Sequence, residues 1–264
     1  MSRSYQDPLL QKIADAARAD VDPDFDFVSP GPIPWRSTAS PVSQTRVALI
    51  TTASLHLEGD RPFRTLEDLQ GDTSYRIIPQ DAPTHALDLA APYVDRRYIP
   101  TDPEVALPRR ALANLHRQGK AGPPAPRHAS FSAGIIHPLP GLADSAASLS
   151  AIFREDAVGA VILFPTCPMC VQTTCVLARE LESRGFVTVA ITLVPELTRI
   201  VGAPRSIALR FPFGAPCGDP GHGALHRAVL LEALDLIASA SEPGTLRESR
   251  LSWRRPPPTA PPAR

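Results

Sequence analysis

Several features that would assign a protein to a class at once are missing from this sequence of 264 residues. Its 27 Lys and Arg residues are balanced by 27 Asp and Glu residues, so the formal net charge is zero. A neutral chain offers no extended positive field for a phosphate backbone, and we expect no nucleic-acid partner. Mean hydropathy is −0.07, and no apolar run approaches the length of about 18 residues that spans a bilayer, so we expect no membrane segment.

Other signals of location and cofactor are also missing. Residues 1–8 contain no apolar stretch typical of a secretory signal. The chain has four cysteines, three of them between positions 167 and 175, which is unlike the framework of a disulfide-rich secreted protein. We therefore expect a cytoplasmic protein. Neither Gly-x-Gly-x-x-Gly nor a phosphate-binding Gly-x-x-x-x-Gly-Lys motif occurs, so the sequence gives no local support for a bound nucleotide.

Proline, by contrast, is abundant, with 31 residues. Because proline fixes φ and cannot donate to a β-ladder, Pro-rich stretches are expected to form loops or, at a chain end, disorder. The distribution predicts a single α/β domain over residues 1–245 and a Pro-rich disordered tail over 246–264. Within the domain we expect long Pro-rich loops at 29–41, 54–103 and 120–140.

Hydrophobic periodicity supplies the elements of this domain. Apolar β-branched runs predict strands at 46–52, 158–164, 186–192 and 206–211. Apolar residues at helical spacing predict helices at 8–19, 104–119, 143–154, 195–201 and 222–240. Strand–helix alternation over the second half predicts a mostly parallel sheet with helices on both faces, a Rossmann-like, doubly wound α/β fold. In such folds the active site lies at the carboxyl ends of the strands.

The most informative motif is Cys167-Pro168-Met169-Cys170, which lies directly between a predicted strand and a predicted helix. Pro168 suits the first position of that helix, and Cys167 then falls at or near its N-cap. A thiol there meets the positive end of the helix dipole and unpaired N–H groups, which stabilise a thiolate. The spacing predicts a nucleophile at Cys167 and a second thiol, Cys170, placed to resolve what Cys167 forms.

A metal site is the alternative for the same cysteines. Cys217 follows a predicted strand end and is a candidate resolving thiol or third ligand beside Cys167 and Cys170. His222 would complete such a set, and soft thiolates favour zinc, copper or an iron–sulfur cluster. Cys175 lies about 140° around the helix from Cys170, which favours a core thiol.

Polar residues after the first strand and in the long loops supply the remaining candidates. Histidine titrates near neutrality, so His56 and His128 are candidate proton donors or acceptors in catalysis. Arginine offers a fork for a carboxylate, which makes the polar motifs of the loops candidates for binding an anionic substrate. These substrate-binding candidates are Asp72, Tyr75, Arg76 and Arg127.

Five segments together resemble the glycine/sarcosine/betaine/D-proline reductase selenoprotein B family, in a short form that contains cysteine instead of selenocysteine. The resemblance covers roughly residues 30–240. In the selenoprotein members, a selenocysteine that precedes a cysteine by three positions attacks the substrate carbon and displaces an amine. The segments that carry the resemblance are 47–63, 71–76 (Gly-Asp-Thr-Ser-Tyr-Arg), 126–131, 166–170 (Thr-Cys-Pro-Met-Cys) and 211–218.

The resemblance implies that Cys167 occupies the selenocysteine position and Cys170 the position of its partner cysteine. We expect a thiol-dependent reductase that cleaves a small, anionic substrate and forms a disulfide, with an external thiol or a redox partner protein as reductant and no resident cofactor. Zinc or another soft metal is the alternative, as is a non-catalytic subunit of a reductase complex, since the family's reductases are assembled from several components. A homo-oligomer is left open.

Overall fold

The computed structural model describes residues 4–64, 71–90 and 94–253. Its centre is a seven-stranded sheet with the order β3-β5-β1-β6-β7-β8-β9. All neighbouring strands run parallel except β3, which pairs antiparallel with β5 at one edge. The strands are β1 (Val47–Thr51), β3 (Tyr75–Pro79), β5 (Arg127–Phe131), β6 (Ala160–Phe164), β7 (Val187–Thr192), β8 (Arg205–Ala208) and β9 (Thr245–Glu248).

The central strands are buried on both faces. Every residue of β1, β6 and β7 is buried, and these strands consist mainly of Val, Ile, Leu and Ala. Continuous apolar composition is typical of parallel strands that are covered by helices on both sides. This is the reason that the sequence pattern identified these three strands.

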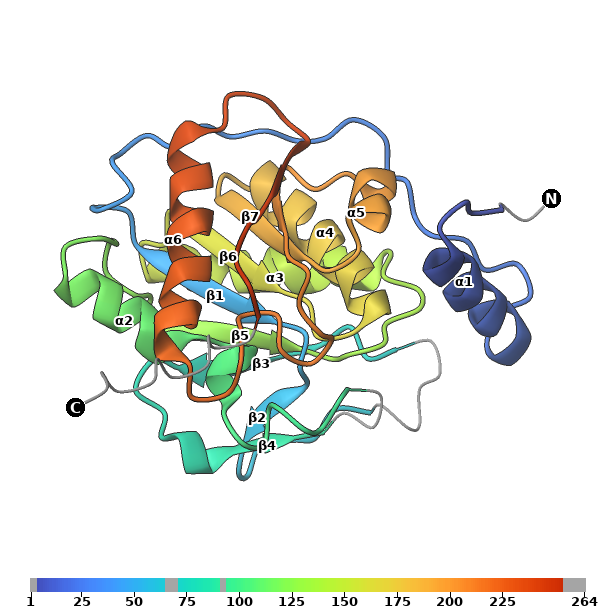
Figure 1. Cartoon of the computed structure of the whole chain (residues 1–264), viewed down its shortest axis with the longest axis horizontal. Coiled ribbons are helices and arrows are strands. Elements are labelled where there is room, and N and C mark those ends of the chain that lie inside the picture. The colour runs from blue at the N-terminus through green and yellow to red at the C-terminus, as the bar shows by residue number, and fades with distance from the viewer. Residues whose placement is uncertain (1–3, 65–70, 91–93, 254–264) are drawn as a thin grey trace, which may run out of the picture.

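Helices cover the sheet in two layers (Figure 1). One layer holds α3 (Gly141–Glu155), α4 (Pro168–Ser183) and α5 (Pro195–Val201), in which α4 packs against both neighbours. In the other layer, α2 (Arg109–Arg117) packs against α6 (Gly223–Ser239). The prediction of a mostly parallel, Rossmann-like sheet with helices on both faces is confirmed. The α1 helix (Pro8–Asp20) lies at one end of the molecule, as Figure 1 shows.

Two of the predicted loops contain strands, which corrects the sequence analysis. Segment 54–103 forms β2 (Leu55–Leu57) and β4 (Leu87–Leu89), which pair in a small antiparallel sheet, as well as β3 of the main sheet. It also forms the 3-10 turns η1 (Thr84–Ala86) and η2 (Pro103–Val105). Segment 120–140 contains β5. These strands are three to five residues long and mix apolar with polar residues, so their periodicity does not stand out in the sequence.

The C-terminal boundary also needs correction. The predicted tail was to begin at residue 246, but Thr245–Glu248 form β9 and pair with β8 along its whole length. The Pro-rich stretch 255–264 lies outside the described residues. The helix predicted at 104–119 begins at Arg109 instead, after Pro108. Among the described residues, no helix is both long and apolar enough to cross a membrane.

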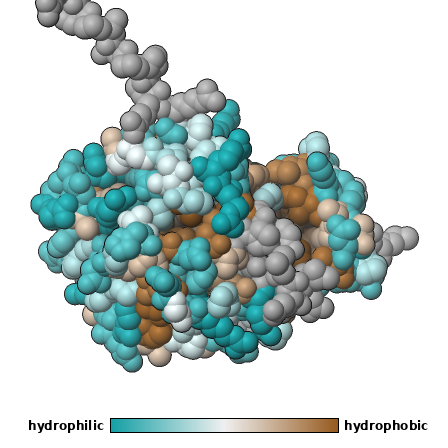
Figure 2. Space-filling view, turned by 90° about the horizontal axis from the view of Figure 1, so that it is seen from below, coloured by the Kyte–Doolittle hydropathy of each residue, from teal (hydrophilic) through white to brown (hydrophobic). Residues whose placement is uncertain are grey.

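The surface seen from below in Figure 2 is mainly polar, and its apolar residues form separate patches. Within the described residues, Leu9 and Leu139 are the large hydrophobic side chains that count as exposed. Most of the apolar content is therefore in the core.

Candidate functional site

The chain changes direction across the sheet between β1 and β6. These strands are neighbours, but the chain leaves β1 toward β5 on one side and leaves β6 toward β7 on the other. The two loops that follow the strands consequently diverge. Such a switch point opens a crevice at the carboxyl edge of the sheet, where open α/β folds bind their ligands.

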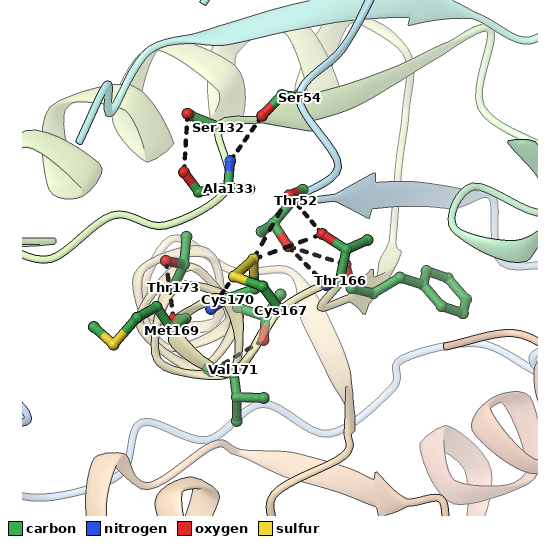
Figure 3. The surroundings of a disulfide bond; sticks show 12 residues. Thr52, Ser54, Ser132, Ala133, Thr166, Cys167, Met169, Cys170, Val171 and Thr173 are labelled. Atoms are coloured by element: carbon green, nitrogen blue, oxygen red, sulfur yellow. Dashed lines mark hydrogen bonds between the residues drawn. A yellow bond between two sulfur atoms is a disulfide. The ribbon is translucent and has the colours of Figure 1, made fainter. Parts of the chain in front are cut away.

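Two threonines fasten the loops together at this point (Figure 3). The Thr166 hydroxyl donates to the Thr52 carbonyl oxygen at 2.8 Å, and the Thr166 amide donates to the Thr52 hydroxyl at 3.2 Å. The Thr52 amide in turn donates to the carbonyl oxygen of Phe164, the last residue of β6. Both threonines are fully buried. This reciprocal pair, the Thr52–Thr166 latch, fixes the backbone that leads into the cysteine turn.

Helix α4 begins on the dithiol motif as the sequence predicts. Cys167 is its N-cap in extended conformation, and Pro168 stands at the first helical position. The Cys167 sulfur accepts a hydrogen bond from the amide of Cys170 at 3.2 Å. The sulfur thus accepts the backbone hydrogen bond that a side-chain oxygen accepts in an ordinary N-cap, and it lies at the positive end of the helix dipole.

Cys167 and Cys170 are joined by a disulfide, with their Cα atoms 4.9 Å apart. The bond lies close beneath the surface, because Cys167 is 5% exposed and Cys170 is fully buried. Cys170 faces two oxygens: the Thr166 hydroxyl lies 3.6 Å and the Thr52 carbonyl oxygen 3.7 Å from its sulfur. The two sulfurs therefore have different surroundings, an N–H donor for one and oxygens for the other.

Ser54 and the end of β5 form the opposite wall of this region (Figure 3). Ser54 is fully buried and has a positive φ of 55°, which a non-glycine residue rarely adopts. Its hydroxyl accepts from the amide of Ala133 at 2.8 Å, and its amide donates to the carbonyl of Phe131 at 2.9 Å. Such backbone outliers cluster at functional sites, where surrounding contacts hold them in place.

Two further hydroxyls at this edge are buried without a hydrogen-bond partner among the described residues. They belong to Thr51 and Ser130, which are paired across β1 and β5. Since most buried polar groups in folded proteins are paired, these two mark a polar position inside the carboxyl edge of the sheet.

His56 lies in β2, two residues beyond Ser54. Its ring nitrogen Nδ1 lies 3.4 Å from the Ser54 carbonyl oxygen, and Nε2 lies 4.0 Å from a carboxylate oxygen of Asp88 on β4. His56 is 6% exposed, and its ring packs edge-on against Phe63. His56 is thus joined to the strand-end wall through Ser54, and its role in proton transfer stays a prediction.

Asp72 and Arg76 organise the loop around them. Burial acts to raise the pKa of Asp72, but hydrogen bonds from Ser74 and the Arg64 amide outweigh it and lower the pKa below its usual value. Arg76 donates to the carbonyl oxygens of Arg61, Pro62 and its own neighbour Tyr75, and to the Ser74 hydroxyl. Its guanidinium also stacks on the Phe63 ring at 4.2 Å.

Most donors of Arg76 are therefore engaged within the loop, which leaves little of the fork predicted for a substrate carboxylate. A pocket of about 490 Å³ nevertheless opens beside it, lined by Asp72, Ser74 and three arginines, Arg61, Arg64 and Arg76. Arg76 is paired with Ser130 across β3 and β5, near the carboxyl end of β5. The pocket combines positive charge with this edge of the sheet, so it is suited to an anionic group.

The remaining substrate-binding candidates make other contacts. The Tyr75 hydroxyl lies 3.1 Å from the hydroxyl of Ser148 on α3, and the Tyr75 ring packs against Phe131. Arg127 stands at the first position of β5, the amino edge of the sheet, where it pairs with Glu155 and Asp156. Because the strand runs from that edge to the other, the structure does not bring Arg127 to the dithiol.

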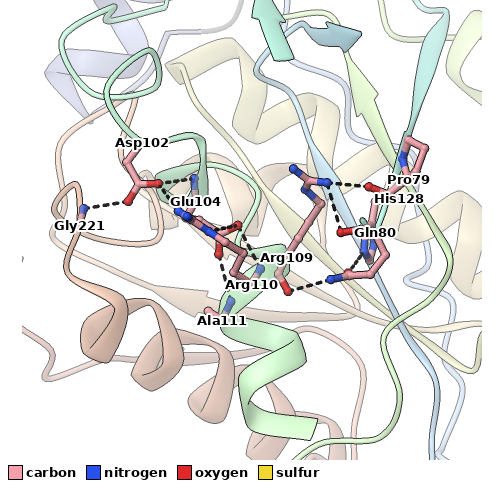
Figure 4. A network of polar contacts seen from close by, with 9 residues as sticks. All are labelled: Pro79, Gln80, Asp102, Glu104, Arg109, Arg110, Ala111, His128 and Gly221. Atoms are coloured by element: carbon pink, nitrogen blue, oxygen red, sulfur yellow. Dashed lines mark hydrogen bonds and ion pairs between the residues drawn. The ribbon is translucent and has the colours of Figure 1, made fainter. Parts of the chain in front are cut away.

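His128 lies inside β5 and is fully buried. Its Nδ1 accepts from the amide of Leu49 at 3.0 Å, and its Nε2 lies 2.6 Å from the Gln80 side-chain oxygen. Burial lowers the pKa of His128 to about 3, with the nearby Arg109 adding to the effect. The ring therefore belongs to the network around Gln80 and Arg109 in Figure 4 and stays neutral at physiological pH. This geometry gives no support to the predicted role of His128 in proton transfer.

The candidate metal ligands are not gathered into one group. Cys217 lies beside α6, with its sulfur 3.6 Å from the carbonyl oxygen of His226, and its amide donates to the Val105 carbonyl. Burial, followed by the charges of Glu104 and Asp102, raises the pKa of Cys217 well above its usual value. In the described part of the chain, no cluster of three or more His, Cys, Asp or Glu side chains could hold a metal ion.

Cys175 is a buried core thiol, as the helical spacing favours. It has no disulfide partner, and burial raises its pKa to about 12. A hydrogen bond with the Thr198 side chain opposes this rise. Of the four cysteines, Cys167 and Cys170 alone are thus paired, and they occupy the switch point.

The sequence analysis missed the residues that shape the sulfur environment. Thr52 and Thr166 act through their hydroxyls and backbone groups. Ser54 acts through a backbone conformation that the local sequence does not predict. The signal that was present is positional: each is a small polar residue within three positions of the end of β1 or β6, the two strands that flank the switch point.

Comparison with known proteins gives two relatives. D-proline reductase subunit gamma of Acetoanaerobium sticklandii is 25% identical over 219 residues, which cover 83% of this chain and 88% of that subunit. Sarcosine reductase complex component B subunit beta of Peptoclostridium acidaminophilum is 26% identical over 234 residues, which cover 86% of this chain and 52% of that subunit. No family model matches the chain, and no solved structure matches it.

These similarities extend over most of the chain, including the dithiol turn and the strands that flank it. They confirm the resemblance to the selenoprotein B family that the five sequence segments predict.

Proposed function

From the similarity to subunits of D-proline and sarcosine reductases, we propose that this chain is a reductase subunit whose Cys167–Cys170 pair alternates between dithiol and disulfide. The observation that carries the proposal is the pairing of these two cysteines at the N-terminus of α4, directly at the switch point of the sheet. Open α/β folds bind their ligands at the carboxyl ends of the strands, and a helix N-terminus stabilises a thiolate.

In the proposed reaction, the Cys167 thiolate attacks an electrophilic atom of the substrate. A bond forms between sulfur and that atom, and the leaving group departs with its electron pair. Cys170 then attacks the Cys167 sulfur, which forms the disulfide and releases the reduced product with the electron pair of the broken sulfur–substrate bond. The proton lost by Cys170 is taken up by the product. The two electrons come from the dithiol, which an external thiol or a redox partner protein restores.

The positively charged pocket beside Arg76 favours an anionic substrate, such as a small carboxylate. His56 is the candidate for moving a proton at this edge, because it is joined to the strand-end wall through Ser54. Since the named relatives are a subunit and a complex component, we expect this chain to work with protein partners. Regeneration of the dithiol requires a reducing compartment, as the cytoplasm is.

Cys167→Ser and Cys170→Ser separate the two proposed roles. The reduced variants would be incubated with a panel of small carboxylates bearing an α-leaving group, and the intact mass would be followed over time. Without Cys170, the first step survives but the adduct cannot be resolved, so a covalent substrate–Cys167 species accumulates. Without Cys167, no adduct forms. The wild-type chain loses two hydrogens as the disulfide forms and releases the reduced product.

A non-catalytic subunit is the second candidate, because the relatives' names place them in multi-component reductases. It predicts no adduct in either variant and no substrate-dependent oxidation of the wild-type dithiol. A metal site predicts a third result, in which both variants lose metal and stability together, since ligands contribute jointly to binding. Metal analysis of the purified protein would accompany the mass measurements.

A further inference from the structure

The two sulfurs of the disulfide meet opposite kinds of polar group. The Cys167 sulfur accepts an N–H from the start of α4, whereas the Cys170 sulfur lies near two oxygens, the Thr166 hydroxyl and the Thr52 carbonyl. In the described part of the chain, no charged side chain lies within hydrogen-bond distance of either sulfur. The difference between the two sulfurs is therefore set by neutral dipoles.

The hydrogen of the Thr166 hydroxyl has a fixed partner. It is donated to the Thr52 carbonyl oxygen at 2.8 Å, a good distance for such a bond. The oxygen of Thr166 consequently turns lone pairs, not its hydrogen, toward Cys170. Both oxygens near Cys170 are then acceptors, which suit an S–H donor and oppose a negative sulfur.

We infer that Thr166 is a positioning residue that, together with the Thr52 carbonyl, keeps Cys170 protonated in the reduced protein and so assigns the attack to Cys167. The inference rests on the proposed dithiol cycle and deepens it. The N–H donor favours a thiolate at Cys167, and the two acceptors favour a thiol at Cys170. The order of the two chemical steps then follows from the hydrogen bonds of one latch.

This arrangement also has a consequence for the second step. Cys170 must lose its proton to attack the Cys167 sulfur, so the S–H bond breaks as the disulfide forms. The acceptors that hold the proton slow this step, while they keep the thiol from competing in the first. Weakening the acceptors should therefore accelerate resolution and leave the initial attack unchanged.

The experiment uses 4,4′-dithiodipyridine, a small neutral disulfide that releases an ultraviolet-absorbing thiopyridone for each thiol that reacts. With the reduced chain, attack by Cys167 releases the first equivalent, and resolution by Cys170 releases the second. Thr166→Val keeps the shape of the side chain and removes its oxygen. We expect the second phase to be roughly threefold faster at pH 7, in keeping with one modest hydrogen bond, and the first phase to keep its rate.

Two further variants separate electrostatics from structure. Thr166→Ser restores the hydroxyl and should restore the wild-type rate of the second phase. Thr198→Val is the matched control, because the buried Thr198 hydroxyl also joins a helix to a strand end, donating to the Thr192 hydroxyl at 2.7 Å. It lies beside Cys175, not beside the disulfide, so it should lower stability without changing either phase.

The outcomes distinguish the inference from the function beneath it. A second phase that is accelerated in Thr166→Val, restored in Thr166→Ser and unchanged in Thr198→Val supports the inference. An unchanged or slower second phase in a folded Thr166→Val protein overturns it, while the dithiol cycle of the wild type stands. If the wild-type chain itself shows no second, intramolecular phase, the proposed dithiol function is overturned.

Discussion

The amino and carboxyl edges of the same sheet are held together by different kinds of buried polar contact. At the amino edge, Glu182 at the end of α4 and Arg205 at the start of β8 form a fully buried ion pair at 2.8 Å. Arg205 also stacks on Trp35 at 3.6 Å and donates to the carbonyl of Arg36. At the carboxyl edge, the buried contacts around the disulfide come from hydroxyls and backbone groups.

This difference indicates that the amino edge contributes mainly to stability and that the carboxyl edge is left for chemistry. Glu182 accepts from the Arg36 amide and from both donors of Thr188, so its charge fastens the Pro-rich segment 30–36 to the sheet. Burial raises the pKa of Glu182, although its hydrogen bonds oppose this effect. Charges of this kind near the disulfide would dominate the state of both sulfurs. Their absence from the described contacts leaves that state to weak, directional dipoles.

The amino-edge clamp provides the largest expected effect. Arg205→Met leaves the Glu182 carboxylate buried without its cation, and loss of one partner of a buried pair typically costs about 3–5 kcal/mol. Urea unfolding at pH 7 measures this loss. Arg247→Met is the matched control, because Arg247 pairs with Asp235 at the surface, where such pairs contribute about 1 kcal/mol or less. Equal losses in the two variants would contradict the assignment of stability to the clamp.

The sequence predicts those strands and helices whose amino-acid composition alone shows that they are buried. Strands β1, β6 and β7 are apolar throughout, and α5 spans the predicted residues 195–201. Strands β3, β5 and β9 were missed because they mix apolar with polar residues and lie toward the edges of the sheet. Their pairing depends on partners distant in sequence, which a local pattern does not contain.

The candidate site was predicted where local rules apply and missed where they do not. A cysteine before proline at a strand–helix junction follows the rules of helix capping, and Cys167 is the N-cap. Arg127 and His128 lie within segment 126–131 of the family pattern, but they occupy the first two positions of β5, away from the carboxyl edge of the sheet. Thr166 acquires its importance from Thr52, which is 114 residues away, and sequence alone does not show that pair.

His128 sharpens the comparison, because it is a titratable group buried between the two edges. The folded pKa of about 3 lies below the unfolded value of about 6.5. Between these values the unfolded chain binds a proton that the folded chain does not, so stability falls as pH falls through this window. The expected loss is about 2 kcal/mol between pH 7 and pH 5.

Urea unfolding at both pH values tests this prediction. His128→Asn removes the ionisable ring and should flatten the pH dependence by about that amount. His85→Asn, at an exposed position, serves as the control and should keep the slope of the wild type. If the slope survives in His128→Asn, another group is responsible for it.

A substitution of Cys217 has the smallest expected effect, and it tests whether this thiol takes part in the chemistry of the Cys167–Cys170 pair. Its thiol is fully buried, its pKa is raised by burial and by Glu104 and Asp102, and its sulfur contacts the His226 carbonyl oxygen. Burial, and then the nearby carboxylates, keep this thiol protonated, whereas a helix N-terminus favours a thiolate at Cys167. We therefore expect Cys217→Ala to lower the free energy of unfolding by about 1 kcal/mol, because the substitution leaves a small cavity.

The reduced Cys217→Ala variant should still form the Cys167–Cys170 disulfide at the wild-type rate, measured by trapping with iodoacetamide and peptide mapping. A slower oxidation, or a mapped bridge from Cys167 to Cys217 in the wild type, would make Cys217 the resolving thiol and remove the distinction between the two environments.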